Sequence, residues 1–154
     1  MDKNDSLRVW GMGARWGNKS MVKEFLEKGY AGIGWLEDEA PSLYSMIREI
    51  RAGDIIYIKS FVRKNCSLHI KAIGKVLSTK VSDSDYFRGK DRHISIQVEW
   101  FNENELDIVY DFSLNTDKNG KIDFRNNVYN NTLYREYSDK IILLIKSHIS
   151  QKIS

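Results

Sequence analysis

Hydrophobic positions in the first half of the chain switch between the spacing of strands and the spacing of helices. The expected elements are a strand over residues 7–10, a helix over 20–28, a strand over 30–36 and a helix from 41 to 52. Asn18 or Ser20 can cap the first helix, and Gly29 is the kind of residue that ends one. Pro41 suits the first turn of the second helix, where an amide hydrogen would be unpaired in any case.

Strands dominate the second half, and one helix closes it. The expected elements are strands over residues 55–62, 67–77, 93–101 and 108–112, and a helix capped by Ser138. The first of these strands is almost continuously apolar, which is typical of a central strand buried on both faces. Residues 93–101 alternate apolar and polar, and we expect them to pair with 108–112. This order predicts an α+β fold, a strongly curved mixed sheet or small β-barrel flanked by helices.

The length and composition indicate a single domain over residues 1–154. Hydrophobic residues make up 42% of the chain, so a core can form without disulfides or a structural metal. The single cysteine, Cys66, has no intramolecular partner, which favours a reducing cytoplasm. The first eight residues contain no apolar segment typical of a signal peptide, and the longest apolar run, 141–145, is too short to cross a bilayer. A net charge of +3 is compatible with a phosphate-bearing partner.

Two local motifs resemble cofactor or metal sites but lack an essential residue. Gly11-Met12-Gly13 begins like a dinucleotide-binding loop, yet the third glycine of that motif would fall on Trp16. Residues 115–126 begin like a calcium loop, yet Asn126 cannot supply the bidentate carboxylate needed at the last position. Asn119-Gly120 within this segment is typical of a hairpin turn. We therefore expect no cofactor.

Catalytic and metal-ligating residues are not evident either. The three histidines fall in different expected elements, and none has a second ligand at metal-binding spacing. Cys66 and His69 are too local to form a nucleophile and base pair, and the acidic residues are scattered over loops. The sequence thus predicts neither an enzyme nor a metal site.

Three tryptophans stand within 26 residues, each close to glycine. Trp10, Trp16 and Trp35 could form a tryptophan-rich core, or they could form a pocket whose indole faces sandwich a planar ligand such as a nucleobase. Trp100, on an alternating strand, is expected to be ordinary core.

The order of elements and motifs adds a family resemblance. Trp10 ends the first strand, Ile33-Gly34-Trp35 follows the first helix, and Gly53-Asp54 leads into the strand 55–61. Ile70-Lys71-Ala72-Ile73-Gly74-Lys75-Val76 comes after a short connection. This series, over about residues 7–80, resembles the PUA-like superfamily, especially its EVE and YTH-related branch, and is similar to the N-terminal modules of modification-dependent restriction systems.

The resemblance implies a small curved barrel with a pocket that accepts one flipped, often modified, base. The residues it assigns to the base pocket are Trp10, Trp16, Asn18, Trp35, Ser60 and Phe61. The residues it assigns to phosphates are Arg15, Lys19, Lys59, Arg63 and Lys64. Extruding a base from a duplex costs a few kcal/mol, which stacking and hydrogen bonds to the base would offset.

The partner expected from this resemblance is nucleic acid, with modified DNA favoured in the context of antiphage defence and RNA as an alternative. A separate nuclease or ATPase could act as the effector, and no membrane partner is expected. A nucleotide or peptide sensor, or a protein-interaction domain, remains the alternative from another functional class. Binding that weakens steeply with salt would favour nucleic acid over this last class.

Overall fold

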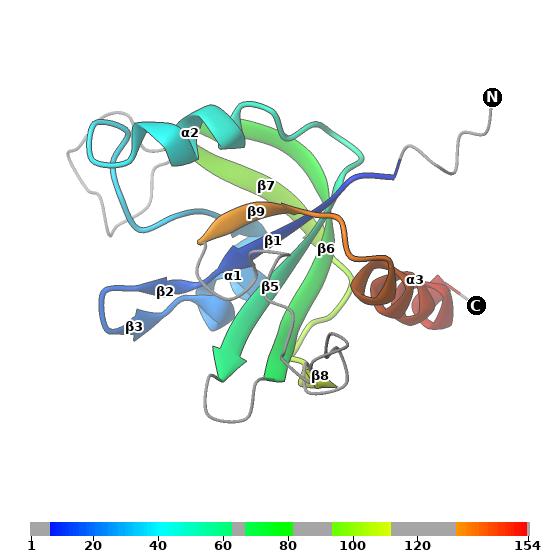
Figure 1. Ribbon diagram of the computed structural model, residues 1–154. Coiled ribbons are helices and arrows are strands. Elements are labelled where there is room, and N and C mark those ends of the chain that lie inside the picture. Colours follow the sequence, from blue (N-terminus) through cyan, green and yellow to red (C-terminus); the bar gives the residue numbers. More distant parts are fainter. Residues whose placement is uncertain (1–6, 63–66, 82–93, 112–131, 154) are drawn as a thin grey trace, which may run out of the picture.

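The structure, a computed structural model, describes residues 7–62, 67–81, 94–111 and 132–153. In this part of the chain a curved mixed sheet has helices on both faces, which confirms the expected α+β class (Figure 1). The strands are β1 (Val9–Gly13), β2 (Arg15–Trp16), β3 (Lys19–Ser20), β4 (Tyr30–Ala31), β5 (Ile55–Val62), β6 (Ser67–Val81), β7 (Ile94–Trp100), β8 (Ile108–Asp111) and β9 (Leu133–Glu136). The helices are α1 (Val22–Lys28), α2 (Pro41–Ile47) and α3 (Asp139–Ile153).

The main sheet has the strand order β4-β7-β6-β5-β1-β9, and β8 pairs with β6 outside this path. Strands β1 and β5 are parallel, whereas the other described pairs are antiparallel. Strands β2 and β3 form a separate hairpin that leaves the end of β1 (Figure 1). Within the described residues no ladder joins β9 to β4, so this sheet is curved and open where the sequence had suggested a barrel.

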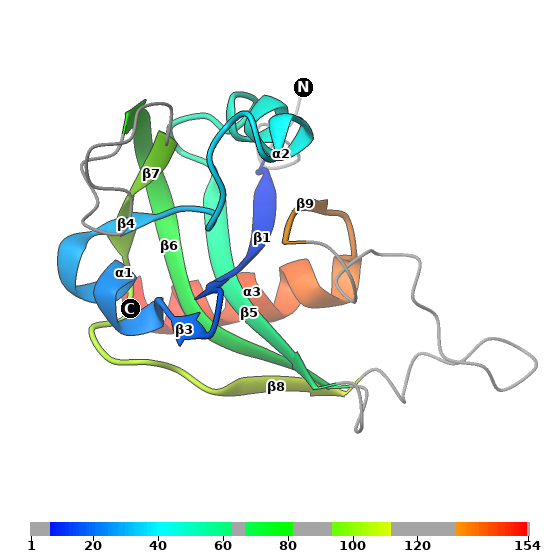
Figure 2. The same cartoon turned by 90° about the vertical axis from the view of Figure 1, so that its left-hand side faces the viewer.

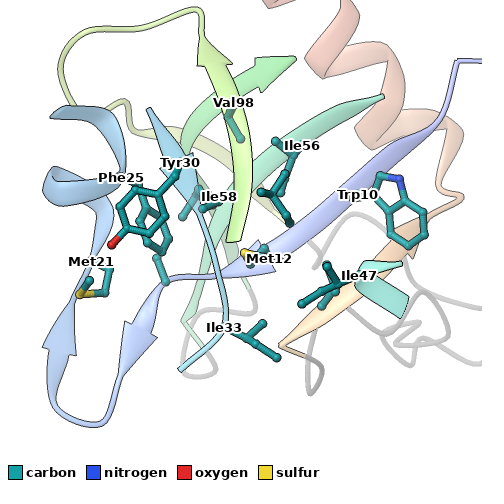
Figure 3. Close-up of a cluster of buried hydrophobic side chains, with 14 of the residues drawn as sticks. Trp10, Met12, Met21, Phe25, Tyr30, Ile33, Ile47, Ile56, Ile58 and Val98 are labelled. Carbon is teal, nitrogen blue, oxygen red and sulfur yellow. The ribbon is translucent and has the colours of Figure 1, made fainter. Parts of the chain in front are cut away.

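Side-chain alternation divides the core into two clusters, one on each face of the sheet. Trp10 and Ile56 belong to the cluster that α1 and α2 cover, and Figure 3 shows them among other buried side chains of this face. Val9 and Tyr57, the neighbouring positions on the same two strands, belong to the cluster that α3 covers. Figure 2 shows α3 behind β5 and β6, on the face opposite α1.

A β-bulge at Lys71 keeps the apolar positions of β6 on their proper faces. Ile58 pairs with Ala72 and Lys59 pairs with Ile70, so Lys71 has no opposite residue on β5. An extra residue of this kind shifts the alternation by one and increases the local twist. Lys71, at this bulge, is one of the residues that line the pocket described below.

Several expected elements are confirmed with small changes of length. β5 has the predicted bounds, and α2 begins at Pro41. Gly29 ends α1 in a left-handed conformation with φ of 71°, as expected for a glycine at that position. The Ser138 hydroxyl accepts a hydrogen bond from the Ile141 amide at 3.4 Å and so caps α3.

Other expectations were wrong. The residue that precedes α1 is Met21, and no side chain caps this helix, so neither Asn18 nor Ser20 has the predicted role. The strand predicted over 30–36 is only Tyr30–Ala31, because the chain bends away at its glycines. β8 pairs with the first half of β6 rather than with β7, since the long β6 extends beyond the end of β7.

Some expectations fall outside the described residues. These are Arg63, Lys64, Cys66, the hairpin turn at 119–120 and the side chain of Phe61. Within the part of the chain that is described, no helix is long and apolar enough to span a membrane.

Candidate functional site

A pocket of about 510 Å³ lies where the parallel strands β1 and β5 end. Gly13 at the end of β1 pairs with Lys59 on β5, and the chain continues into the β2–β3 hairpin at Arg15. The carboxyl ends of parallel strands meet at one edge of a sheet, which is a common place for ligands to bind. The size also falls within the usual range of ligand pockets.

Polar side chains dominate the chemistry of this pocket. Its cations are Arg15, Lys59 and Lys71. Its hydroxyls are those of Ser20, Ser60 and Thr132. Among the lining residues that the structure describes, Glu105 is the one carboxylate, so cations outnumber acids in this part of the chain. Such a site favours an anionic ligand that also accepts hydrogen bonds.

Lys59 is held at the pocket in a partly buried position. Its ammonium nitrogen lies 5.9 Å from the centre of the Tyr134 ring, within range of a cation–π interaction. Gly13 leaves room for its stem, since a methyl group added at Gly13 would lie 3.8 Å from Cε of Lys59. Burial lowers the pKa of Lys59 from its ordinary value, because desolvation disfavours the charged form. A bound anion would offset this penalty.

A buried chain of hydrogen bonds holds Tyr134 in place. The hydroxyls of Tyr57 and Tyr134 lie 2.6 Å apart, and the Tyr57 hydroxyl donates to the Glu136 carboxylate at 2.5 Å. Tyr57 has one hydroxyl proton, so Tyr134 is the donor in the first of these bonds. Gly11 lies against the Tyr134 ring, because a carbon added at Gly11 would overlap the ring.

The ionisation of this chain follows from its burial. Desolvation raises the pKa of Tyr57 and of Tyr134 well above the ordinary value for tyrosine. Desolvation also raises the pKa of Glu136, and the hydrogen bond from Tyr57 partly offsets that effect. Both tyrosines are therefore neutral donors at physiological pH, which agrees with the direction of the hydrogen bonds.

Arg15 reaches the pocket from the β2–β3 hairpin. It is exposed, and its guanidinium donates to the Asn18 carbonyl oxygen at 3.2 Å across the hairpin turn. Lys19 is also exposed and lies 3.9 Å from Glu24, but it does not line the pocket. Of the cations expected from the hairpin, Arg15 alone therefore faces the candidate site.

Lys71 joins the pocket to a charged group on β6 and the segment before β8. Its ammonium lies 3.6 Å from Glu105 and 3.3 Å from Asp107. Asp107 also contacts Nδ1 of His69 at 2.8 Å, and the hydrogen bonds from His69 and Lys71 lower the pKa of this exposed carboxyl group. Two carboxylates therefore neutralise Lys71, and the other two cations that line the pocket are Arg15 and Lys59.

Ser67, His69 and Asp107 form a row that resembles a nucleophile, a base and an orienting acid. The Ser67 hydroxyl lies 3.2 Å from Nε2 of His69, whose other nitrogen contacts Asp107. However, Ser67 is only 5% exposed, and neither it nor His69 lines the pocket. The row links β6 to the segment before β8.

Trp16, one of the three expected cage residues, lies in the core. Its indole N–H donates to the Gly32 carbonyl at 3.1 Å, and its ring packs edge-on against Phe25 at 5.8 Å between centres. A carbon added at Gly34 would lie 2.9 Å from the same indole. The glycine near this tryptophan therefore makes room for core packing rather than for a ligand.

Trp10 is buried as well, and Trp35 is the exposed member of the set. The Trp10 N–H donates to the Asp54 carboxylate at 2.9 Å. Trp35 is 44% exposed, and its carbonyl accepts a hydrogen bond from the Tyr44 hydroxyl at 2.6 Å. None of these tryptophans lines the pocket, so the structure does not bring the three expected cage residues together around it. Trp100 packs against the core as expected, with its N–H bonded to the Phe25 carbonyl at 2.8 Å.

The structure brings together three residues that the sequence had suggested and adds several others. Arg15, Lys59 and Ser60 line one pocket, whereas Asn18 and Lys19 lie near it on the hairpin. Sequence reasoning missed Ser20, Lys71, Glu105 and Thr132. For Lys71 a signal was present, because apolar residues at 68, 70 and 73 break strict alternation and so indicate a bulge.

No protein-family model matches this chain, and no curated protein matches it. Among the described residues no group of three or more histidine, cysteine or acidic side chains is arranged to hold a metal ion.

Proposed function

We propose that this domain binds nucleic acid and holds one nucleotide, with its phosphate, in the pocket at the ends of β1 and β5. The observation that supports this most strongly is the convergence of Arg15 and Lys59 on one pocket, together with three hydroxyl groups. The cations would attract the phosphate, and the hydroxyls of Ser20, Ser60 and Thr132 would bond to the sugar or to the edge of the base.

The binding mechanism follows from these groups. Phosphate contacts position a nucleic acid without reading its sequence, and they make affinity depend on salt. A phosphate near Lys59 would offset the desolvation penalty of its ammonium group, since an opposite charge favours the charged form. The Tyr134, Tyr57 and Glu136 chain would keep Lys59 in position without contacting the ligand.

Within this proposal the PUA-like resemblance gives the finer expectation. The ligand would be a flipped and modified base in DNA, read by a cytoplasmic module that works with a separate nuclease or ATPase. Because Trp10 and Trp16 are covered by protein, reading of the base would depend on the polar groups of the pocket. An RNA ligand is the alternative within the same fold.

A second candidate function is the sensing of a free nucleotide. The volume of about 510 Å³ favours it, because a pocket of this size can bury a small ligand without further contacts. A free nucleotide and a nucleic acid share the same phosphate chemistry. The two ligands differ in one respect: in a nucleic acid, the nucleotides on either side of the one in the pocket can also contribute to affinity.

The test is a binding titration of labelled single-stranded DNA against the parent domain, Lys59→Met and Lys75→Met. Lys75 is an exposed lysine of β6 outside the pocket and serves as the control. We expect Lys59→Met to reduce the slope of log affinity against log salt by about 1, and Lys75→Met to leave it nearly unchanged. Equal slopes for all three proteins would refute the phosphate role of the pocket. Binding of mononucleotides as tight as that of the oligonucleotide would favour the sensor.

A further inference from the structure

A column of alternating cations and aromatic rings lies across the start of β1 and the end of β9, away from the pocket. The Arg8 guanidinium lies 5.4 Å from the centre of the Trp10 ring, and that of Arg135 lies 5.7 Å from the same ring. Arg135 also lies 5.2 Å from the ring of Tyr137. The side chains of the column therefore follow the order Arg8, Trp10, Arg135 and Tyr137, and we call this set the Tyr137 column.

Several contacts hold the Arg8 end of this column in place. Arg8 lies 3.3 Å from the Asp54 carboxylate and donates to the Glu49 carbonyl at 2.5 Å. Asp54 also accepts the indole N–H of Trp10 at 2.9 Å. A ring that stacks on a fixed group has lost much of its freedom before a ligand arrives, which lowers the entropic cost of binding.

The other end of the column is open. Tyr137 is 74% exposed, although Arg135 lies over one face of its ring. Asp54 neutralises Arg8, but among the described residues no carboxylate lies within ion-pair distance of Arg135. An exposed aromatic face beside a cation without an acidic partner suits a base whose backbone is anionic. A purely apolar partner would gain nothing from the charge.

The column and the pocket lie at opposite ends of β9. Thr132 of the pocket immediately precedes β9, and Tyr137 immediately follows it (Figure 1). Five residues of extended chain span about 17 Å at about 3.4 Å each. This is roughly the length of five nucleotides stacked at 3.4 Å per step. One single strand is therefore long enough to reach both places.

We propose that Tyr137 is a stacking platform for a nucleobase, with Arg135 beside it for the phosphate backbone, on the same single strand whose nucleotide occupies the pocket. This inference rests on the proposed function and adds a second contact to it. Stacking is insensitive to salt and independent of sequence, whereas the pocket supplies a salt-sensitive contact. The two contributions can be separated by experiment.

The test compares Tyr137→Ala and Tyr137→Phe with the parent domain. Each protein is titrated with a single-stranded DNA of mixed sequence and with a copy whose nucleotides are abasic. We expect Tyr137→Ala to weaken binding of the normal strand roughly 5- to 150-fold, the range found when a stacking aromatic is removed. Tyr137→Phe retains the ring and should bind within about 3-fold of the parent. Leu77→Ala, at another exposed apolar side chain, is the control for surface change.

The abasic strand and the salt series distinguish the possible outcomes. Tyr137→Ala should bind the abasic strand as the parent does, and its salt slope should equal that of the parent. Loss of affinity for both strands would refute stacking, as would equal binding of the normal strand by Tyr137→Ala and the parent. If the parent binds and Lys59→Met weakens binding while Tyr137→Ala does not, the platform is wrong and the pocket stands. If the parent binds no strand at low salt, both proposals fall.

Discussion

Replacing Tyr57 with phenylalanine should destabilise the domain more than the same replacement at Tyr134. The Tyr57 hydroxyl lies in the middle of the buried chain, where it donates to Glu136 and accepts from Tyr134. Removing it eliminates a bond to a charged group, which is worth about 1.5–3 kcal/mol, and leaves the Tyr134 hydroxyl without an acceptor, at a cost of about 1–3 kcal/mol. We therefore expect a loss of about 2.5–6 kcal/mol in the free energy of unfolding.

Tyr134→Phe removes only the neutral donor at the end of the chain. Its expected cost is about 1 kcal/mol, since Tyr57 keeps its bond to Glu136. The comparison is well matched, because both substitutions remove one hydroxyl from a buried ring.

The pH dependence of the Tyr57→Phe defect provides a second readout. Burial raises the pKa of Glu136 above its unfolded value of about 4.3, and the bond from Tyr57 opposes that rise. Without Tyr57 the folded pKa rises further, so the folded variant binds a proton before the unfolded chain does. The loss in free energy of unfolding is therefore largest above the Glu136 pKa of the folded variant, and it becomes smaller as pH falls from there toward the Glu136 pKa of the folded parent.

Urea unfolding at about pH 8 and about pH 5, followed by tryptophan emission, measures both effects. Trp10 and Trp16 are each 2% exposed and will report the loss of the core. The reasoning is refuted if Tyr134→Phe costs as much as Tyr57→Phe, or if the Tyr57→Phe deficit is the same at both pH values.

Two further predictions concern packing and charge. Gly34→Ala should lower the free energy of unfolding by about 1–3 kcal/mol, because its methyl group would lie 2.9 Å from the buried Trp16 ring. Gly13→Ala should lower it by less than about 1 kcal/mol, because the nearest atom to its methyl group is 3.8 Å away. Urea unfolding measures both, and similar losses for the two variants would contradict this packing. In His69→Asn the pKa of Asp107 should move up toward its usual value of about 3.9, as seen by carboxyl NMR titration, since the bond from His69 is the main cause of its lowering. The lowered pKa of Asp107 stabilises the fold above the unfolded pKa, and this contribution is lost as pH falls through the folded pKa. An unchanged Asp107 pKa in His69→Asn would exclude the bond from His69 as the cause of the lowering.

Local patterns in the sequence predicted the elements that local physics determines. The apolar run of β5, the proline that opens α2 and the glycine after α1 each depend on a few neighbouring residues, and all three predictions were confirmed. The parallel pairing of β1 with β5 depends on residues 46 positions apart, as in the pair Val9 and Ile55, and no local pattern encodes it. The pocket exists because of that pairing.

The tryptophans show the opposite case, in which a strong local signal suggested a different role. Glycine beside tryptophan is compatible with a ligand pocket and with close packing of an indole. Contacts distant in sequence decide between them: Trp10 bonds to Asp54, and Trp16 bonds to Gly32. Of the cations that the sequence had suggested for phosphate, Arg15 and Lys59 line the pocket and Lys19 does not.

The most direct test of the pocket is a map of backbone amide NMR shifts as single-stranded DNA is added to the domain. The account predicts that the shifts cluster at Gly13, Arg15, Ser60 and Thr132, and that they become smaller in Lys59→Met at the same DNA concentrations, because this variant binds more weakly. Shifts that cluster around Trp35 or along the exposed side of α3 instead, with the pocket residues unchanged, would contradict it.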